Sequence, residues 1–356
     1  MKRDPLILVI NLGSTTTKVG LFAGKEAVFR ETVTHSSQDL SHCRGIEGEL
    51  RLRAGTIKEI LSNHSVELSE LDIIVSRGGL SRPVNPGIYK ITQAMCDDLR
   101  SGRYGHHSAN LGPIIAGEMA QTLGIDAVVV DPPTADEMEP IAKISGLRAV
   151  ERKSALHVLS QRAVAWRAAQ QLGKTYHEVN LIVVHLGGGI TIGAHKRGQI
   201  VDGTHGLSEG PFTPERAGSL PTMELVEISF SGRYTKEELK EKLVREGGLQ
   251  SYLGTRDAKA VEERIAKGDE YARLIYEAMT YQIAKEIGAM ATVLYGEVDA
   301  IVLTGDLAHS PRLVQEIRNR VFWIAPLLVH PGEEELEALA AGGMRVWRGE
   351  EVAREY

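Results

Sequence analysis

Short apolar runs rich in β-branched residues alternate along this chain with longer segments of helical periodicity. Apolar runs of this kind predict buried strands at residues 6–12, 72–76, 127–130, 180–186 and 300–304. Neighbouring runs predict further strands at residues 18–22, 27–33, 190–195, 199–201 and 324–329. Amphipathic spacing predicts helices at residues 46–62, 113–123, 154–172 and 333–348, other helical segments up to residue 295, and a helix from residue 311. This alternation is typical of an α/β protein.

The chain contains an internal repeat. Residues 9–18 (VINLGSTTTK) and residues 183–192 (VVHLGGGITI) each combine an apolar strand, a polar-Leu-Gly step, a tight turn of small residues and a second strand. Two unrelated glycine-containing hairpins could produce the same similarity by coincidence. We interpret the repeat as two domains of one topology, each opening with a hairpin that faces a common cleft, and a length of 356 residues agrees with two cores.

Composition narrows the classes of partner. The formal net charge is −6 and no basic stripe is visible, so we predict no nucleic-acid partner. Cys43 and Cys96 are the only cysteines and lack metal-ligand spacing, which fits reduced thiols in a cytoplasmic setting. The apolar run near the N-terminus is too short for a signal-peptide core, and no apolar stretch is long enough for a membrane span. We therefore predict a cytoplasmic protein that binds small molecules or copies of itself.

The two repeated turns carry the first candidate chemistry. Turns of glycine, serine and threonine expose backbone N–H groups and hydroxyls, which are the groups that hold phosphate oxygens. The first turn offers the side chains of Asn11, Ser14, Thr16 and Lys18. The second turn, Gly187, Gly188 and Gly189, permits close approach of the backbone to a phosphate. Neither turn is a Walker A motif, and each taken alone could be an ordinary glycine-rich turn.

Three charged residues stand beside predicted strand ends or glycines. Asp131 directly follows a buried strand, where α/β proteins bind ligands, and could contact Mg²⁺ or simply stabilise a turn. Arg77 also follows a buried strand, and Arg216 lies within the glycine- and proline-rich loop at residues 202–221. Both arginines could bind phosphate or carboxylate, although a surface salt bridge is the commoner fate of an arginine.

Histidines and a run of glutamates complete the candidates. His157 lies early in a predicted helix and His185 ends the strand before the second turn, where each could be catalytic or simply packed. The pair His106-His107 lacks a third ligand at suitable spacing, so we predict no zinc site. Residues 333–335 are three glutamates that open the last predicted helix, where they could cap the helix or reach a hydrated Mg²⁺.

Taken in order, these segments resemble the acetate kinase family, and in particular its butyrate kinase branch. The matching stretches are residues 11–18, 76–83, 105–112, 131–138, 185–195, 210–218, 303–310 and 331–351. The resemblance implies two similar actin-like (ribonuclease H-like) α/β domains, each with a mixed five-stranded sheet, around a nucleotide cleft. It places one domain at residues 1–149 plus about 342–356, and the other at residues 150–341.

The resemblance also implies roles for individual residues. Asn11, Ser14, Thr16 and Lys18 match the first phosphate motif, and Gly187 to Gly189, preceded by His185, match the second. Asp131 matches a cleft aspartate near the metal, and Arg216 matches an arginine that stabilises the transferring phosphoryl group. His157 matches a catalytic histidine, whereas the family's arginine lies a few residues before Arg77.

The remaining matches concern the nucleotide and the metal. The stretch containing Gly305 and Asp306 resembles an adenosine-binding strand and loop, with Asp306 where a glycine is usual. Glu334 falls nearest the glutamate associated with magnesium, and Glu335 is its alternative.

The implied activity is reversible transfer of the γ-phosphate of ATP to a short-chain carboxylate, with Mg²⁺ as cofactor. Butyrate is the expected acceptor, giving butyryl phosphate and ADP, and acetate, propionate or a branched-chain acid are the alternatives. The resemblance also implies a homo-oligomer. Two rivals stay open: a sugar kinase that uses Asp131 as its base, and a nucleotide-gated binding protein of the same fold.

Overall fold

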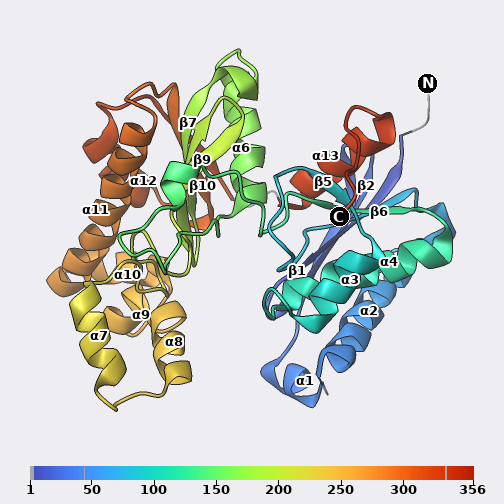
Figure 1. Cartoon of the computed structure of the whole chain (residues 1–356), viewed down its shortest axis with the longest axis horizontal. Helices are drawn as coiled ribbons and strands as arrows, with labels where there is room; N and C mark the ends of the chain where they lie inside the picture. The colour runs from blue at the N-terminus through green and yellow to red at the C-terminus, as the bar shows by residue number, and fades with distance from the viewer. Residues whose placement is uncertain (1–3, 44, 333–334) are drawn as a thin grey trace. The chain divides into compact units, whose positions relative to one another are not determined.

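A computed structural model of the protein describes residues 4–43, 45–332 and 335–356 (Figure 1). The chain divides into two compact units. Unit 1 comprises Met1–Asp136 with Glu334–Tyr356, and unit 2 comprises Glu137–Glu333. The divisions thus fall at residues 136/137 and 333/334, whereas the family resemblance implied 149/150 and about 341/342. Among the described residues, every helix is too short or too polar to span a membrane.

Unit 1 is built on a mixed sheet with the strand order β3-β2-β1-β4-β6-β5. Its strands are β1 (Leu6–Leu12), β2 (Thr16–Ala23), β3 (Glu26–Thr34), β4 (Ile73–Ser76), β5 (Ile88–Lys90) and β6 (Asp126–Val130). Strands β1, β4 and β6 run parallel, while β2, β3 and β5 pair antiparallel with their neighbours. The short edge strand β5 adds a sixth strand, in the described residues, to the five that were expected.

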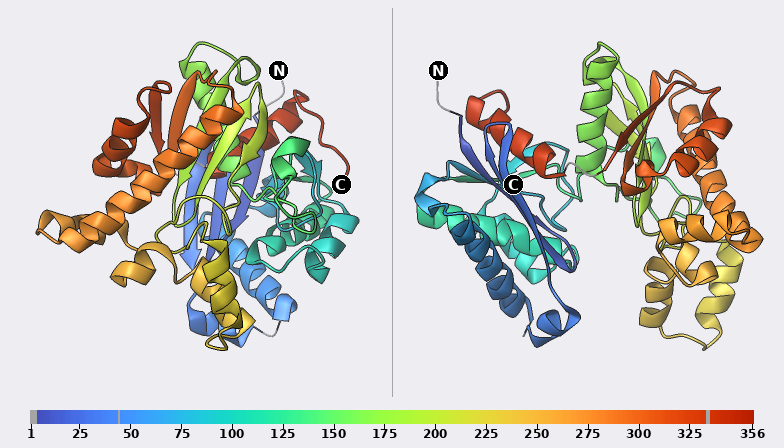
Figure 2. Two further views of the ribbon diagram at one scale, coloured as in Figure 1. Left: turned by 60° about the vertical axis from the view of Figure 1, so that its left-hand side comes forward. Right: turned by 180° about the vertical axis from the view of Figure 1, so that it is seen from behind.

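Helices cover both faces of this sheet. They are α1 (Ser37–His42), α2 (Gly45–Asn63), α3 (Gln93–Ser101), α4 (Leu111–Leu123) and α13 (Glu335–Arg348), with 3-10 turns η1 (Leu68–Glu70) and η2 (Ser108–Asn110). Leu8 and Ile10 of β1 pack against α2 and α4, whereas α13 lies on the opposite face (Figure 2). A Cβ at Gly342 or Gly343 would stand 2.5 Å or 2.6 Å from a valine of the sheet, so these glycines bring α13 close to the strands.

Unit 2 repeats this topology around a second mixed sheet, with the order β11-β10-β7-β8-β9. Its strands are β7 (Asn180–Leu186), β8 (Ile190–Lys196), β9 (Gln199–Gly203), β10 (Ala300–Gly305) and β11 (Leu327–Pro331). Strands β7, β8 and β9 form an antiparallel meander, and β10 and β11 continue it in parallel with β7, as β4 and β6 do beside β1. The repeat seen in the sequence therefore corresponds to equivalent hairpins, β1–β2 and β7–β8.

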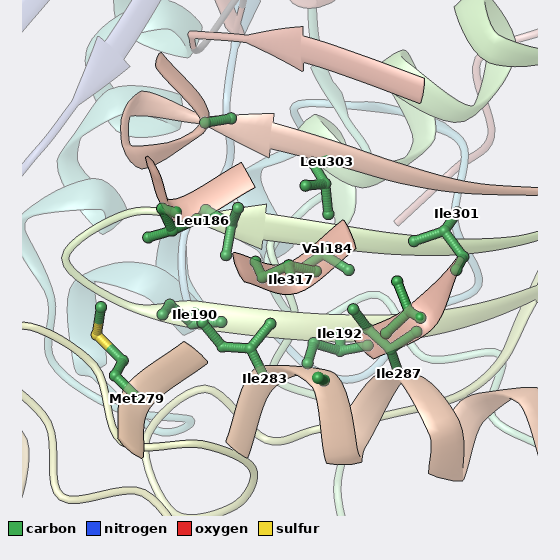
Figure 3. Packing of buried hydrophobic residues seen from close by; sticks show 14 of the residues in the cluster. Val184, Leu186, Ile190, Ile192, Met279, Ile283, Ile287, Ile301, Leu303 and Ile317 are labelled. Carbon is green, nitrogen blue, oxygen red and sulfur yellow. The ribbon is translucent and has the colours of Figure 1, made fainter. Parts of the chain in front are cut away.

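The helices of unit 2 form two layers and a helical extension. They are α5 (Pro140–Lys143), α6 (Val158–Gln171), α7 (Thr222–Phe230), α8 (Lys236–Val244), α9 (Gly248–Leu253), α10 (Ala258–Ala266), α11 (Glu270–Val293) and α12 (Pro311–Val321), with η3 (Tyr176–Glu178) and η4 (Asp306–His309). On one face, Met279, Ile283 and Ile287 recur every fourth residue of α11 and pack on the sheet (Figure 3). Each such buried side chain contributes about 1.5–3 kcal/mol to stability. Helix α6 covers the other face.

Candidate active site

Three carbonyl groups at the turn of the β1–β2 hairpin, those of Ser14, Thr15 and Thr16, accept hydrogen bonds within the protein. Gly13 N–H donates to the carbonyl of Thr16 at 2.9 Å, and His35 N–H donates to that of Thr15 at 2.8 Å. The guanidinium of Arg53 donates to the carbonyls of Ser14, at 3.0 Å, and Thr16, at 2.8 Å. With these oxygens engaged, the surface of the turn presents N–H groups and the exposed Ser14, which suits an anion.

Arg53 comes from α2 and is fully buried. It also forms an ion pair with Glu49 one helical turn away, at 2.9 Å. The same guanidinium is one cause, after burial, of the lowered pKa of His35, whose Nε2 lies 2.8 Å from the Thr17 hydroxyl. A buried positive charge therefore stands directly behind the first turn.

A polar cluster lies on the α13 face of the same hairpin. The side-chain amide of Asn11 donates to Oε2 of Glu335 at 2.6 Å, and both residues are buried. Nη2 of Arg77 lies 3.7 Å from Oε1 of Glu335. Lys18 is the cross-strand partner of Asn11, so its side chain belongs to the same face of the sheet. Unit 1 thus brings Asn11 and Arg77 together at Glu335, the first residue of α13, with Lys18 on the same face of the sheet.

Asp131 follows β6 at the same carboxyl edge of the parallel strands. Its φ of 42° is left-handed, a conformation that aspartate tolerates better than most residues. Two hydrogen bonds with Gly87 hold it there: its N–H donates to the Gly87 carbonyl at 2.9 Å, and the Gly87 N–H donates to Oδ1 at 2.8 Å. This buried carboxylate is therefore fixed in position at a strand end.

The second turn lies in unit 2, and Arg216 packs directly over it. A Cβ at Gly189 would stand only 2.2 Å from Nη1 of Arg216. Nη1 itself donates to the carbonyl of Gly206 at 2.7 Å. The hydroxyl of Thr213 donates to the Gly188 carbonyl at 2.6 Å and thereby ties the loop that carries Arg216 to the turn. The absence of side chains in this turn makes room for the guanidinium.

Arg216 keeps an unused donor. In the part of the chain that the structure describes, its buried Nε makes no hydrogen bond. Burial lowers the pKa of the Arg216 guanidinium, and the Glu215 carboxylate partly opposes that shift. Arginine nevertheless stays protonated in proteins, so a cation with an unsatisfied donor lies beside the glycine turn. An anionic ligand would supply the missing acceptor.

His157 and His185 stack beside this turn. Their ring centroids are 4.0 Å apart with an interplanar angle of 17°. His157 is the residue that precedes α6, one position before the helix begins, rather than a residue of its first turn. Its Nδ1 lies 3.0 Å from the Thr191 hydroxyl, and Nδ1 of His185 lies 3.0 Å from the Ser160 hydroxyl. Unit 2 thus combines the turn, Arg216 and a positioned histidine.

The candidate nucleotide strand and loop adjoin the same turn. Thr304 pairs in parallel with His185, so Gly305 follows alongside Leu186. At Gly305, where φ is 90°, a Cβ would stand 2.4 Å from the Leu186 carbonyl oxygen, and only glycine fits. Asp306 is exposed at the start of η4.

The donor set can be tested against magnesium. No group of three or more His, Cys, Asp or Glu suited to a metal ion occurs among the described residues. Mg²⁺ is commonly held by one or two carboxylates together with waters and substrate phosphates, and does not require such a cage. Glu335 and Asp131, each a buried carboxylate at the carboxyl edge of unit 1, fit that requirement. Glu334, the predicted metal residue, lies outside the described residues.

The site includes residues that sequence patterns did not single out. Arg53 looks like one half of a surface pair with Glu49, because the two are four residues apart on a helix. Thr191 lies in the repeated segment but was given no role there, and Gln161 carries no motif. Thr191 contacts His157, and Gln161 contacts Thr191. Only the long-range contacts reveal them.

Comparison with known proteins adds the family. A model of the acetokinase family matches residues 143–328, just over half of the chain. The chain belongs to this family. The predicted acetate kinase family resemblance is thereby confirmed, while the finer assignment to its butyrate kinase branch is left as a proposal.

Solved structures show the same fold as this acetokinase family chain. An acetate kinase from Porphyromonas gingivalis has a TM-score of 0.78 at 19% identity, covering 96% of this chain and 100% of that one. A propionate kinase from Francisella tularensis has a TM-score of 0.74 at 19% identity, covering 94% and 98%. A ROK family protein from Streptococcus pneumoniae, solved with sucrose, has a TM-score of 0.50 at 14% identity, covering 97% and 100%. The predicted fold class, two mixed-sheet α/β domains of the actin-like type, is confirmed.

Proposed function

We propose that this protein transfers the γ-phosphate of ATP reversibly to a short-chain carboxylate, forming an acyl phosphate and ADP, with butyrate as the preferred acceptor. Membership of the acetokinase family supports the reaction class. The observation that carries the proposal is Arg216, a half-buried cation whose buried Nε donor is unsatisfied in the described residues and which packs over a side-chain-free turn. This arrangement suits a transferring phosphoryl group.

The acceptor needs little activation. A short-chain carboxylic acid has a pKa near 4, about that of a glutamate side chain, so it is ionised at neutral pH. Catalysis then depends on alignment and charge neutralisation rather than on a base. Arg216 donates to the oxygens of the phosphoryl group and stabilises their negative charge while the group is transferred. His157 donates to an equatorial oxygen of the same group. Arg77 orients a carboxylate or phosphate in unit 1.

Each of the two turns binds phosphate oxygens. In unit 1 the backbone N–H groups, with Ser14, Thr16 and Lys18, hold phosphate oxygens. In unit 2 Gly187 to Gly189 allow close backbone approach, and Gly305 and Asp306 contact the nucleoside. Glu335 and Asp131 would hold Mg²⁺, directly or through water, and the bound ion would supply charge neutralisation for the nucleotide phosphates. We propose Glu335 in preference to Glu334 because Asn11 and Arg77 converge on it.

The preference for butyrate rests on sequence. Residues 210–218 and 331–351 are the stretches that most resemble the butyrate kinase branch. One methylene changes discrimination in an apolar pocket by only about 1–3 kcal/mol, so acetate, propionate and branched acids are the competing acceptors. We further propose that the protein acts in the cytoplasm as a homo-oligomer, and that its two domains correspond to units 1 and 2.

An acyl-hydroxamate assay tests the proposal. Purified protein is mixed with Mg-ATP, hydroxylamine and straight or branched acids of two to six carbons, and the Arg216→Ala protein serves as the control for contaminating kinases. ATP-dependent hydroxamate with a maximum at four carbons supports the full proposal. A maximum at two or three carbons contradicts the butyrate preference alone, and no product with any acid contradicts the carboxylate reaction.

The sugar kinase remains the rival with a specific observation behind it, because Asp131 is a buried carboxylate at a strand end. A sugar hydroxyl needs a base, so its phosphorylation should lose rate as that carboxylate is protonated. The carboxylate reaction should show no such base in its kcat profile above the pKa of the acceptor.

A further inference from the structure

A continuous chain of hydrogen bonds leads from His157 into the core of unit 2. Nδ1 of His157 lies 3.0 Å from the Thr191 hydroxyl, which lies 2.9 Å from Nε2 of Gln161. The amide oxygen of Gln161 lies 3.1 Å from Nε2 of His195, and Nδ1 of His195 lies 2.8 Å from the Tyr176 hydroxyl. All but His157 are fully buried, so water does not compete with these bonds.

The donors and acceptors in this series of hydrogen bonds could be arranged in either of two directions. The backbone carbonyl of Thr191 decides between them. Nε2 of Gln161 also faces the backbone carbonyl of Thr191, at 3.3 Å. A carbonyl only accepts, so the amide nitrogen must point toward Thr191 and the amide oxygen toward His195. With the amide reversed, two oxygens would face each other in the core.

The amide orientation fixes the protons on both sides. His195 must carry its proton on Nε2 to donate to the amide oxygen, and its Nδ1 then accepts from the Tyr176 hydroxyl. Burial, with a smaller contribution from Arg162, lowers the pKa of His195 to about 3, so this imidazole is neutral near pH 7 and holds one proton. On the other side, the Thr191 hydroxyl accepts from the amide N–H and keeps its own hydrogen for Nδ1 of His157.

We infer that Thr191, Gln161 and His195 form a relay that holds His157 as its Nε2–H tautomer. A histidine whose Nδ1 accepts carries its single proton on Nε2. The stacked ring of His185 fixes the plane of the imidazole, so tautomer and orientation are both set before a ligand binds. The three relay residues are positioning residues. Their importance for phosphoryl transfer rests on the proposed function, whereas the tautomer itself does not.

The backbone is shaped around this relay. A Cβ at Gly193 would stand 2.3 Å from the amide oxygen of Gln161 and 3.3 Å from Nε2 of His195. A residue with a side chain at position 193 would therefore displace the hydrogen bond between Gln161 and His195. The glycine at this strand position is therefore explained by the passage of the relay.

The first test measures the tautomer directly. Protein labelled with ¹⁵N in its histidines is studied by long-range ¹H–¹⁵N correlation NMR, which distinguishes protonated from unprotonated ring nitrogens, and His157→Gln assigns the signal. At pH 8, well above the ordinary pKa of a histidine, and without ligands, we expect His157 and His195 each to carry a single proton, on Nε2. A His157 that carries its proton on Nδ1, or that exchanges freely between tautomers, would overturn the inference. This readout is independent of any kinase activity.

The second test reverses the relay with nearly isosteric changes. In Gln161→Glu the introduced carboxyl group, once ionised, accepts from the Thr191 hydroxyl, and the oxygen of that hydroxyl then accepts from Nδ1 of His157, so the proton of His157 moves to Nδ1. While the carboxyl group is protonated it still donates towards the Thr191 carbonyl, so the tautomer is recorded over a range of pH. The loss of one donor to the transition state should lower kcat about 100-fold with little change in the KM of the carboxylate. Gln170→Glu makes the same change at an exposed position of α6 and should behave as wild type.

Thr191 supplies the check on folding. Thr191→Val keeps the shape but leaves Nδ1 of His157 without its hydroxyl, so we expect mixed tautomers and reduced kcat. Thr191→Ser restores the hydroxyl and should restore both. A Gln161→Glu or Thr191→Val protein with lower kcat but an unchanged tautomer would overturn the relay. A changed tautomer with wild-type kcat would overturn its link to the reaction, and a protein that phosphorylates no carboxylate would contradict the proposed function alone.

Discussion

The β1–β2 and β7–β8 hairpins occupy equivalent positions in the two units, yet each uses its arginine differently. Arg53 lies behind the first turn, fully buried, and donates to two of its carbonyls. Arg216 lies over the second turn and keeps its Nε without a partner in the described residues. A satisfied arginine shapes a turn, whereas an unsatisfied one is prepared for a ligand. In two units of the same topology, one arginine thus stabilises its turn and the other is a candidate ligand-binding residue.

The strongest test of this contrast is Arg216→Ala. An arginine that stabilises a transferring phosphoryl group contributes about 10³-fold or more to kcat, so we expect a loss of that order with an unchanged thermal midpoint. Steady-state kinetics and thermal unfolding measure the two effects. Arg256→Ala removes an exposed arginine that pairs with the neighbouring Glu215, and should leave kcat unchanged. Near-normal kcat in Arg216→Ala would remove the central residue from the mechanism.

Arg53→Met should show the opposite pattern. It removes the donors to the Ser14 and Thr16 carbonyls and leaves Glu49 without its ion pair, so we expect a loss of about 2–4 kcal/mol in the free energy of unfolding. Denaturant unfolding measures it, and the KM of ATP should rise because the turn loses its brace. Arg51→Met, an exposed change on the same helix, is the control. Unchanged stability would show that the turn does not depend on Arg53.

Alanine substitutions in the second turn give a smaller and more local effect. In Gly189→Ala the new methyl group must displace the Arg216 guanidinium, since it would stand 2.2 Å from Nη1. Displacements of about 1 Å can reduce rates 100-fold, so we expect kcat to fall by about 10-fold to 100-fold. In Gly188→Ala the nearest atom is Oε1 of Glu215 at 3.3 Å, the end of a flexible side chain, and the loss should be clearly smaller. Equal losses would contradict the packing of Arg216 on Gly189.

Each unit also has a buried histidine whose pKa is lowered: His35, which follows β3 and contacts Thr17 of the first hairpin, and His195 of β8. The unfolded chain protonates His195 near pH 6.5, but the native protein does so only near pH 3, so the unfolded state binds more protons between these values. The free energy of unfolding should therefore fall as the pH falls below 6.5, by about 2 kcal/mol at pH 5 from this group. Unfolding of wild type and His195→Gln at pH 7 and pH 5 measures the difference. An identical pH dependence in the two proteins would contradict it.

Sequence patterns predicted the parts of this architecture that repeat a simple physical period. The buried strands and the paired hairpins were readable because β-branched runs and small-residue turns are local signals. The three-residue strand β5 was not predicted, because it is too short for a period to show. Helix α3 was not predicted either. Strand β11 lies at Leu327–Pro331 rather than at the predicted 324–329, since helix α12 is followed by a turn through Ile324 and the strand begins only after Pro326.

The candidate site was only partly visible for a different reason. Asn11, Arg216 and the glycine turn stand in recognisable motifs, but their partners come from distant segments. Glu335 reaches Asn11 across 324 residues, and Gln161 reaches Thr191 across 30. Such contacts depend on the packing of helices on sheets, which no local pattern encodes.

Helix α13 has a consequence for the order in which the protein is made. It belongs to unit 1 and covers one face of β1, β4 and β6, yet it follows all of unit 2 in the chain. Translation runs from the N-terminus, so every described strand of both sheets is synthesised before this helix. Until then Ile7 and Val75 lack their glycine-lined cover, and Asn11 lacks its carboxylate partner. The first part of the protein to be synthesised is therefore the last to be complete.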